Sequence, residues 1–246
     1  ALSSAASDVY KRQALDITDI NKYKVNDISE TLQYIKKYCG EDVPLSTHFI
    51  ETDSDTWDSV SAYDPFFEGV VCIKTKEEFT EKIKQNRVLT GVDVAIYILS
   101  KIKCTHLSLE KLVYFSYADY LCKHSKRLFV DKIYAFKHGP VVESVYERYK
   151  SSGTRYVNSF EFGIDKEAKT NVEMPAAKSR ILFASDGIQK LCSIDETLKI
   201  YGSCKAGTLV SITHRKNSPW SHVDSTIPYA IISDDLIKNY HSYECL

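Results

Sequence analysis

The sequence lacks any apolar run near the ~20 residues that a membrane-spanning helix needs. It also lacks an excess of either charge, because 32 Lys and Arg stand against 33 Asp and Glu, for a net charge of −1. No overall field therefore indicates nucleic acid or an anionic membrane as a partner. The chain of 246 residues, 43% hydrophobic and 26% charged, is typical of a soluble globular protein with one large domain, or with a main domain and a smaller companion.

The common catalytic motifs are also missing. There is no GxSxG elbow, no glycine-rich phosphate loop and no HExxH. A nucleophile–base pair would need side chains in hydrogen-bond contact, which a sequence cannot show. The candidate groups for such a pair are His138, His214, His222, Asp131, Glu143 and Asp224. We expect no catalytic activity and no cofactor.

The seven cysteines, at 39, 72, 104, 122, 192, 204 and 245, are odd in number and form no CxxC pair. This pattern favours reduced thiols in the core of a cytoplasmic protein over a disulfide framework. The pairs Cys104–His106 and Cys122–His124 are too closely spaced and too isolated for a tetrahedral zinc site. We therefore expect no metal site.

The first third of the chain differs in character from the rest. Residues 1–13 are small, polar and unpatterned, and we interpret them as a non-native or disordered leader. Residues 14–87 predict a small α/β or α+β extension of unknown role, with a helix over 26–39, a strand over 69–73 and a helix that Thr75 caps. Residues 40–68 carry eight acidic residues and no Lys or Arg, which fits either a solvated loop or an acidic-aromatic partner surface around 57–67.

Beyond Arg87 the apolar spacing is mainly helical. It predicts helices over 90–102 and 108–124, a short strand or extended segment within 129–137, and further helices over 187–201, 205–215 and 234–240. Residues 163–178 have no periodicity and read as a polar excursion. After His138 and Gly139, Pro140 fits the first turn of a helix that ends at Gly153. We expect His138 to lock this turn by a hydrogen bond, and His214 to cap its own helix or pack against Trp220.

Three segments carry a family resemblance: LEKLVYFSYADYL (109–121), IYAFKHGPVVESVYERYK (133–150) and LVSITHRKNSPW (209–220). In this order they resemble the Panacea domain, the antitoxin domain of many bacterial and phage toxin–antitoxin pairs. The resemblance covers roughly residues 90–243 and says nothing about 14–87. It implies a mainly α protein, with a compact multi-helix domain over 88–246 that contains a short strand or hairpin.

The resemblance also implies a cytoplasmic, non-catalytic antitoxin that binds a cognate toxin protein of unknown identity. Two alternatives stay open. One is a protease adaptor, or a phage-encoded interaction protein without a toxin. The other is a DNA-binding autoregulator, which would contact DNA through the basic cluster of residues 123–132. The same cluster equally fits lysines at the solvated C-terminal end of a helix.

Aromatic side chains are rigid, amphipathic interface residues, and several of them crowd the segment around the His-Gly-Pro turn. The candidate partner-binding residues are Tyr134, Phe136, His138, Tyr146, Tyr149 and Arg127. The motif residues for which we expect structural roles are Lys111, Tyr114, Gly139, Pro140, Val141, Tyr146, Thr213, His214, Pro219 and Trp220.

Overall fold

The computed structural model describes residues 2–4, 13–17, 25–157, 173–224 and 226–246. The chain divides into two compact units. Unit 1 comprises residues 1–88 and 182–186, and unit 2 comprises residues 89–181 and 187–246. None of the helices in these described ranges is long and apolar enough to cross a membrane.

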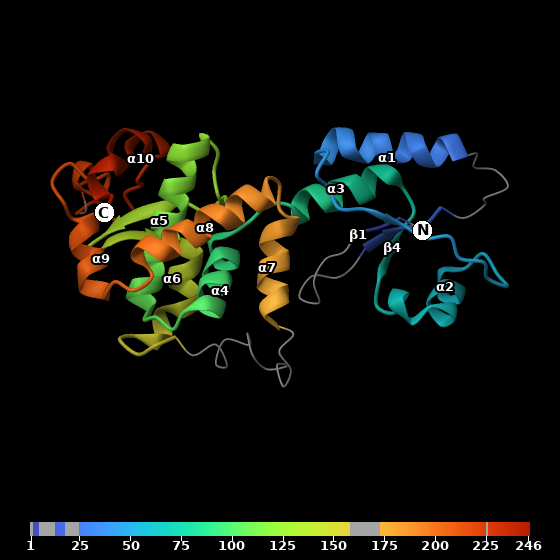
Figure 1. Ribbon diagram of the computed structural model, residues 1–246, viewed down its shortest axis with the longest axis horizontal. Coiled ribbons are helices and arrows are strands. Elements are labelled where there is room, and N and C mark those ends of the chain that lie inside the picture. The colour runs from blue at the N-terminus through green and yellow to red at the C-terminus, as the bar shows by residue number, and fades with distance from the viewer. Residues whose placement is uncertain (1, 5–12, 18–24, 158–172, 225) are drawn as a thin grey trace. The chain divides into compact units, whose positions relative to one another are not determined.

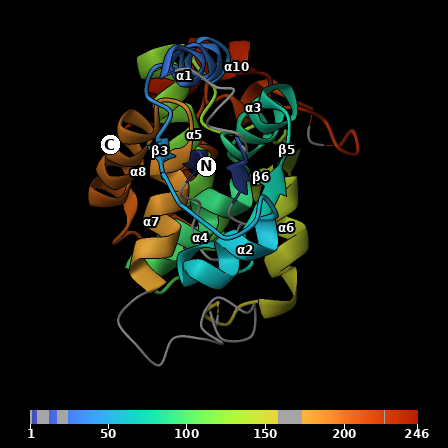
Figure 2. The same cartoon turned by 90° about the vertical axis from the view of Figure 1, so that its right-hand side faces the viewer.

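Unit 1 is a small α+β unit, as the sequence predicts. In its described residues four strands, β1 (Leu2–Ser4), β2 (Gln13–Leu15), β3 (Ser46–Thr47) and β4 (Val71–Ile73), lie in the order β3-β1-β2-β4. Only β2 and β4 run parallel. Helices α1 (Val25–Cys39) and α3 (Lys76–Asn86) lie together on one side of the sheet, and α2 (Trp57–Tyr63) lies on the other (Figures 1 and 2). Strand β1 falls within the segment that we interpret from sequence as a leader.

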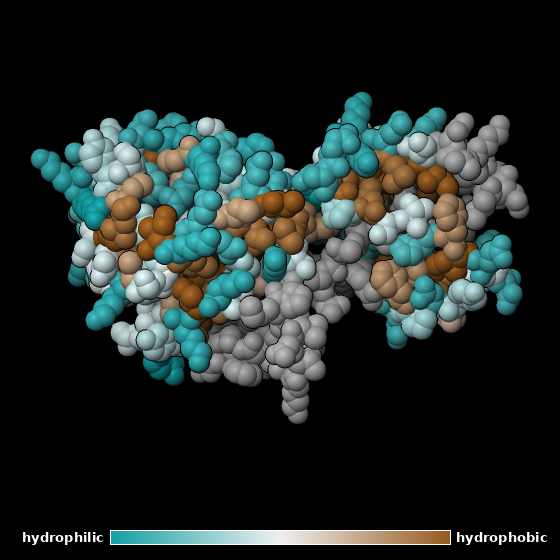
Figure 3. Space-filling model, in the orientation of Figure 1, coloured by the Kyte–Doolittle hydropathy of each residue, from teal (hydrophilic) through white to brown (hydrophobic). Residues whose placement is uncertain are grey.

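Two apolar clusters hold unit 1 together. Ile35 of α1 and Phe79 and Ile83 of α3 pack on Leu15 and Ile73 of the sheet. In Figure 3 the outer side of α1 is hydrophilic, whereas hydrophobic surface gathers beneath it, which fits an amphipathic helix.

The second cluster of unit 1 joins Ala14, Phe67 and Val70, with Trp57 and Val60 packed against them. The segment around Trp57 and Val60 forms helix α2 and the 3₁₀ turn η1 (Pro65–Phe67), which place these two side chains against the cluster. This part of residues 40–68, for which the sequence leaves open a solvated loop or an acidic-aromatic partner surface, is helical.

Unit 2 is built around α5 (His106–His124), which is buried on nearly every side. Helices α4 (Gly91–Lys101), α6 (Glu143–Tyr149), α8 (Gly187–Tyr201), α9 (Ala206–Thr213) and α10 (Asp234–Tyr240) surround it (Figure 1). The mainly α prediction is confirmed. One helix was not predicted from sequence: α7 (Glu173–Phe183) begins inside the expected polar excursion, most of which lies outside the described residues.

Side-chain caps mark several of the helix starts. Thr90 and Asp93 form a reciprocal capping box at α4, and Ser233 accepts a hydrogen bond from the backbone N–H of Leu236 at α10. Helix α5 begins one turn earlier than its apolar stripe predicts, because Thr105 rather than Ser108 is its N-cap.

All seven cysteines are free thiols. Cys39 and Cys104 are buried, whereas Cys122, Cys192 and Cys245 are exposed. The prediction of reduced cysteines fits this structure, but the prediction that they belong to the core holds for only some of them.

Candidate partner-binding surface

The His-Gly-Pro turn is the tip of a β-hairpin. Strand β5 (Ile133–Phe136) pairs antiparallel with β6 (Gly139–Val142), and Lys137 and His138 form the two-residue loop between them. Gly139 has φ +98°, in the region that glycine tolerates. The short hairpin of the predicted fold class is thus present.

The prediction that Pro140 starts a helix is wrong, because Pro140 lies inside β6 and α6 begins at Glu143. Proline fits here for a physical reason. Ala135, its partner across the hairpin, donates its N–H to Ala230 on the other side of β5. The ladder between β5 and β6 therefore needs no N–H from position 140.

The outer edge of β6 is closed by two consecutive side chains of α5. The ammonium group of Lys111 donates to the carbonyl oxygen of Pro140 at 2.6 Å, and a Glu110 carboxylate oxygen accepts the N–H of Val142 at 2.9 Å. Both side chains are buried, at 0% and 1% exposure. Burial lowers the pKa of Lys111 to about 8, although the carboxylates of Glu110 and Glu244 oppose this shift.

Gly139 is the point where all three family segments meet, because Lys111 and Thr213 from the other two segments lie beside it. A Cβ atom there would lie 2.6 Å from the hydroxyl oxygen of Thr213 and 3.0 Å from Cε of Lys111. Only a residue without a side chain allows this approach.

The hairpin tip is held from α9 and the segment after it. Nε2 of His214 lies 3.3 Å from the carbonyl oxygen of Lys137. Nδ1 of the same ring lies 2.7 Å from the carbonyl oxygen of Val210, which belongs to α9. The indole N–H of Trp220 donates to the carbonyl oxygen of Phe136 at 2.9 Å, and its ring lies 3.9 Å from that of His214. His138 does not lock the turn as we expected: it is exposed, and no hydrogen bond joins it to another described residue.

The outward face of the hairpin carries a cluster of aromatic rings. Tyr134 and Phe136 alternate on this face, with ring centroids 6.3 Å apart. Tyr146 of α6 meets Phe136 edge-on at 5.5 Å, and Tyr229 meets Tyr134 at 5.6 Å and Phe136 at 5.9 Å. Tyr134 is buried beneath the other three rings, at 8% exposure, Phe136 and Tyr146 are half-buried, and Tyr229 is 65% exposed. We call these four residues the aromatic face.

The other candidate residues lie apart from the aromatic face. Tyr149 is fully buried, so it is removed from the surface set. Arg127 forms an ion pair with Asp234 at 2.6 Å, and the hydroxyl of Tyr117 donates to the other oxygen of the same carboxylate at 2.7 Å. Sequence reasoning missed Tyr229, although the alternation of Ile227, Tyr229 and Ile231 could have indicated a displayed edge.

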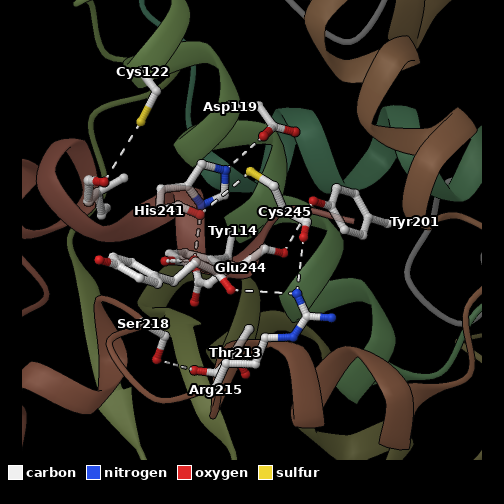
Figure 4. Close-up of polar contacts among 12 residues, drawn as sticks. Tyr114, Asp119, Cys122, Tyr201, Thr213, Arg215, Ser218, His241, Glu244 and Cys245 are labelled. Atoms are coloured by element: carbon white, nitrogen blue, oxygen red, sulfur yellow. Dashed lines mark hydrogen bonds and ion pairs between the residues drawn. The ribbon is translucent and has the colours of Figure 1, made fainter.

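A buried polar network ties the last turn of the chain to α5 (Figure 4). His241 is 2.7 Å from Asp119 and 2.9 Å from Glu244, and the hydroxyl of Tyr114 donates to the same oxygen of Glu244 at 2.8 Å. Burial alone would lower the pKa of His241, but hydrogen bonds to the two carboxylates outweigh it and raise the pKa to about 9. Among the described residues, no group of three or more His, Cys, Asp or Glu side chains could hold a metal ion.

Residues 109–221 match the family described as "Antitoxin SocA-like, Panacea domain". The Panacea resemblance is confirmed. The matched range runs from the first turn of α5 to the 3₁₀ turn η4 (Trp220–His222), so it contains all three motif segments but is narrower than 90–243.

A curated relative, "Antitoxin SocA" of Caulobacter vibrioides (strain NA1000 / CB15N), is 26% identical over 119 residues. The alignment covers 48% of this chain and 59% of that protein. No solved structure matches the chain. The Panacea segment therefore supplies the hairpin, the side chains that hold it and most of the aromatic face, while Tyr229 lies beyond it.

Proposed function

We propose that this protein is an antitoxin that neutralises a cognate toxin by direct protein–protein binding, and that the aromatic face is part of the binding surface. The Panacea match and the relative named as an antitoxin support the class of function. The aromatic face supports the mode, because tyrosine and phenylalanine give large contact areas at low cost in side-chain entropy.

The observation that carries the proposal is that the three family segments meet at the hairpin. All three of them converge on the hairpin: α5 closes its outer edge, Thr213 packs on Gly139, and Trp220 and His214 hold its tip. A hairpin held in this way presents its outer face already ordered. Binding through a preorganised surface loses less conformational entropy, so more of the contact energy appears as affinity.

The mechanism we propose is steric. An antitoxin that covers the active surface of its toxin needs affinity and residence time, and no chemistry of its own. Lysine and arginine side chains near the face would add selectivity for the toxin rather than most of the affinity.

The first test is co-expression with the product of the reading frame beside this gene. We expect that product to arrest growth when expressed alone and to be harmless with this chain, with the two co-purifying as a complex. No rescue, together with salt-sensitive binding of this chain to its own promoter, would contradict the proposal and favour the autoregulator.

The second test changes the aromatic face. Phe136→Ala and Tyr146→Ala should each weaken toxin binding at least about tenfold and reduce rescue, because truncating an aromatic hot spot costs about 2 kcal/mol or more. Thermal melting should show that both variants fold. Tyr156→Ala is the matched control, because Tyr156 is 68% exposed and lies outside the aromatic face. If both face variants bind and rescue like the wild type, this surface is not the interface.

A further inference from the structure

Strand β5 has a second neighbour. On the side away from β6, Ala135 donates to the carbonyl oxygen of Ala230 at 2.8 Å, and Ile232 donates to that of Ile133 at 2.9 Å. Tyr134 and Ile231 form an antiparallel bridge between these bonds. Residues 230–232 are therefore a third, strand-like edge of the hairpin sheet.

The backbone of Ile231 faces away from this sheet. Since its neighbours Ala230 and Ile232 make the bonds to β5, the N–H and C=O of Ile231 point to the opposite side. Neither group bonds to another residue in the described ranges. The far edge of the same sheet is closed by Glu110 and Lys111, so position 231 is where the sheet stays open.

The turn that leads into this edge holds an aromatic residue in an unfavourable conformation. Ala230 donates to the carbonyl oxygen of Ile227 at 3.2 Å, with Pro228 and Tyr229 at the two central positions. Tyr229 has φ +57°. The second central position of such a turn usually holds glycine or asparagine when φ is positive.

Tyr229 differs from the other strained positions of the described chain. The other non-glycine residues with positive φ there are Ser125, Asp186 and Asn217, which are small or polar. Tyrosine lacks the local hydrogen bonds that make this region accessible to Asn and Asp. The fold thus keeps a bulky ring at a strained position and leaves it 65% exposed.

Exposed apolar side chains alternate along this edge. Ile227, Tyr229 and Ile231 are 56%, 65% and 48% exposed, and the ring of Tyr229 continues into the aromatic face through Tyr134 and Phe136. We call residues 227–231 the Tyr229 edge. It offers a backbone donor and acceptor beside a row of apolar groups.

We propose that the Tyr229 edge takes up an extended segment of the partner protein as an added β-strand, with Tyr229 as its aromatic anchor. This inference rests on the proposed function. An extended backbone can satisfy the N–H and C=O of Ile231 together, and apolar side chains at alternate positions of the added strand would lie against the aromatic face. The edge alone is far smaller than the ~1,200 Å² that a stable interface buries, so a second copy held there alone would not form a stable dimer.

Two substitutions remove binding features without breaking a hydrogen bond between described residues. Tyr229→Gly relieves the positive φ and deletes the anchor, and Ile231→Pro deletes an N–H that bonds to no described residue. We expect both variants to melt at or near the wild-type temperature. Each should bind the adjacent-gene toxin product at least about tenfold more weakly by isothermal titration calorimetry. Ile231→Thr, which keeps the backbone groups, should lose less affinity than Ile231→Pro.

The control is Ile188→Ala, because Ile188 is a 71% exposed isoleucine on α8. Amide exchange of Ile231 should be fast in the free chain and protected in the wild-type complex. If the wild type binds the product and both variants bind equally well, the inference is overturned and the proposed function stands. If the wild type does not bind the product at all, the proposed function fails. If the wild type dimerises alone and both variants are monomers, the edge is a self-association site instead.

Discussion

At the scale of single residues, Gly139 shows how closely the hairpin is packed. It combines φ +98° with close side-chain neighbours: a Cβ atom would lie 2.6 Å from Thr213 Oγ1 and 3.0 Å from Lys111 Cε. Gly153 offers a matched control, because its φ is +56° and nothing lies within 4 Å of its Cβ position. Gly139→Ala should lower the free energy of unfolding by about 3 kcal/mol or more, through backbone strain and steric overlap together. Gly153→Ala should cost about 1–3 kcal/mol, from the backbone strain of its φ +56° and ψ −124° alone.

Urea denaturation of both glycine variants measures this difference. Equal losses would mean that Thr213 and Lys111 move aside without cost, so that the contact at Gly139 contributes nothing beyond its backbone angle.

His241 makes the stability of the fold depend on pH. Its pKa in the folded chain is raised from 6.5 to about 9, so the folded state holds a proton that the unfolded state releases in this interval. The stabilisation is fully present below pH 6.5 and is lost as the pH rises through about 9. A shift of this size corresponds to about 3 kcal/mol. His241→Gln should therefore remove a downward slope of stability between pH 6.5 and 9.

The quantity to measure is the difference in the free energy of unfolding between the wild type and His241→Gln, because the titration of Lys111 changes stability with pH in the opposite direction in both proteins. Its pKa is lowered from 10.5 to about 8, so the folded state gains stability as the pH rises from 8 to 10.5. Urea melts at pH 6.5, 7.5 and 9 separate the two effects. His138→Gln, which changes an exposed histidine, should follow the wild-type curve. Parallel curves for the wild type and His241→Gln would contradict the assignment.

At the scale of elements, the hairpin depends on Trp220. Trp220→Phe keeps an aromatic ring beside His214 but loses the N–H that donates to the carbonyl oxygen of Phe136. We expect a loss of about 1 kcal/mol in stability, and faster hydrogen exchange of the hairpin amides than of those in α5. Trp57→Phe, which changes the tryptophan in the second apolar cluster of unit 1, should leave hairpin exchange unchanged. Uniform acceleration in α5 and the hairpin would show that Trp220 supports the whole unit instead.

Helices with regular apolar spacing were the elements that sequence predicted best. The apolar spacing of α5 and the Ser233 cap of α10 each lie within a single element, so local spacing is enough to find them. The second strand of the hairpin was assigned to a helix because Pro140 is equally suited to a helix start and to a strand position that donates no ladder hydrogen bond. What decides between them is the donor of Lys111, 29 positions earlier in the chain.

The candidate site was predicted only in part for the same reason. Tyr134, Phe136 and Tyr146 were found because they crowd one short segment. Tyr229 joins them through a bridge between Tyr134 and Ile231, almost a hundred positions apart, which no local pattern contains. The lock on the turn was assigned to His138 instead of His214, because which histidine reaches the carbonyl oxygen of Lys137 depends on the fold; the contacts of His214 with its own helix and with Trp220 are those expected.

At the scale of the whole molecule, the division into two units has a direct consequence. The hairpin, α5, the tip contacts and the Tyr229 edge all belong to unit 2. Unit 1 has its own apolar clusters and contributes no residue to the aromatic face. Unit 2 should therefore fold and bind the toxin without unit 1.

The test is a chain that starts at Val88. Unit 1 also includes Leu182–Asp186, where Phe183 is buried beside Arg87, so the truncated chain should carry Phe183→Gln to avoid a new exposed apolar side chain. We expect cooperative thermal melting and toxin affinity within about threefold of the full chain. A truncated chain that melts cooperatively but loses rescue would show that unit 1 supplies contacts of its own. Its exposed Phe49, Tyr63 and Phe66, set among the carboxylates of residues 40–68, would then be the residues to change next.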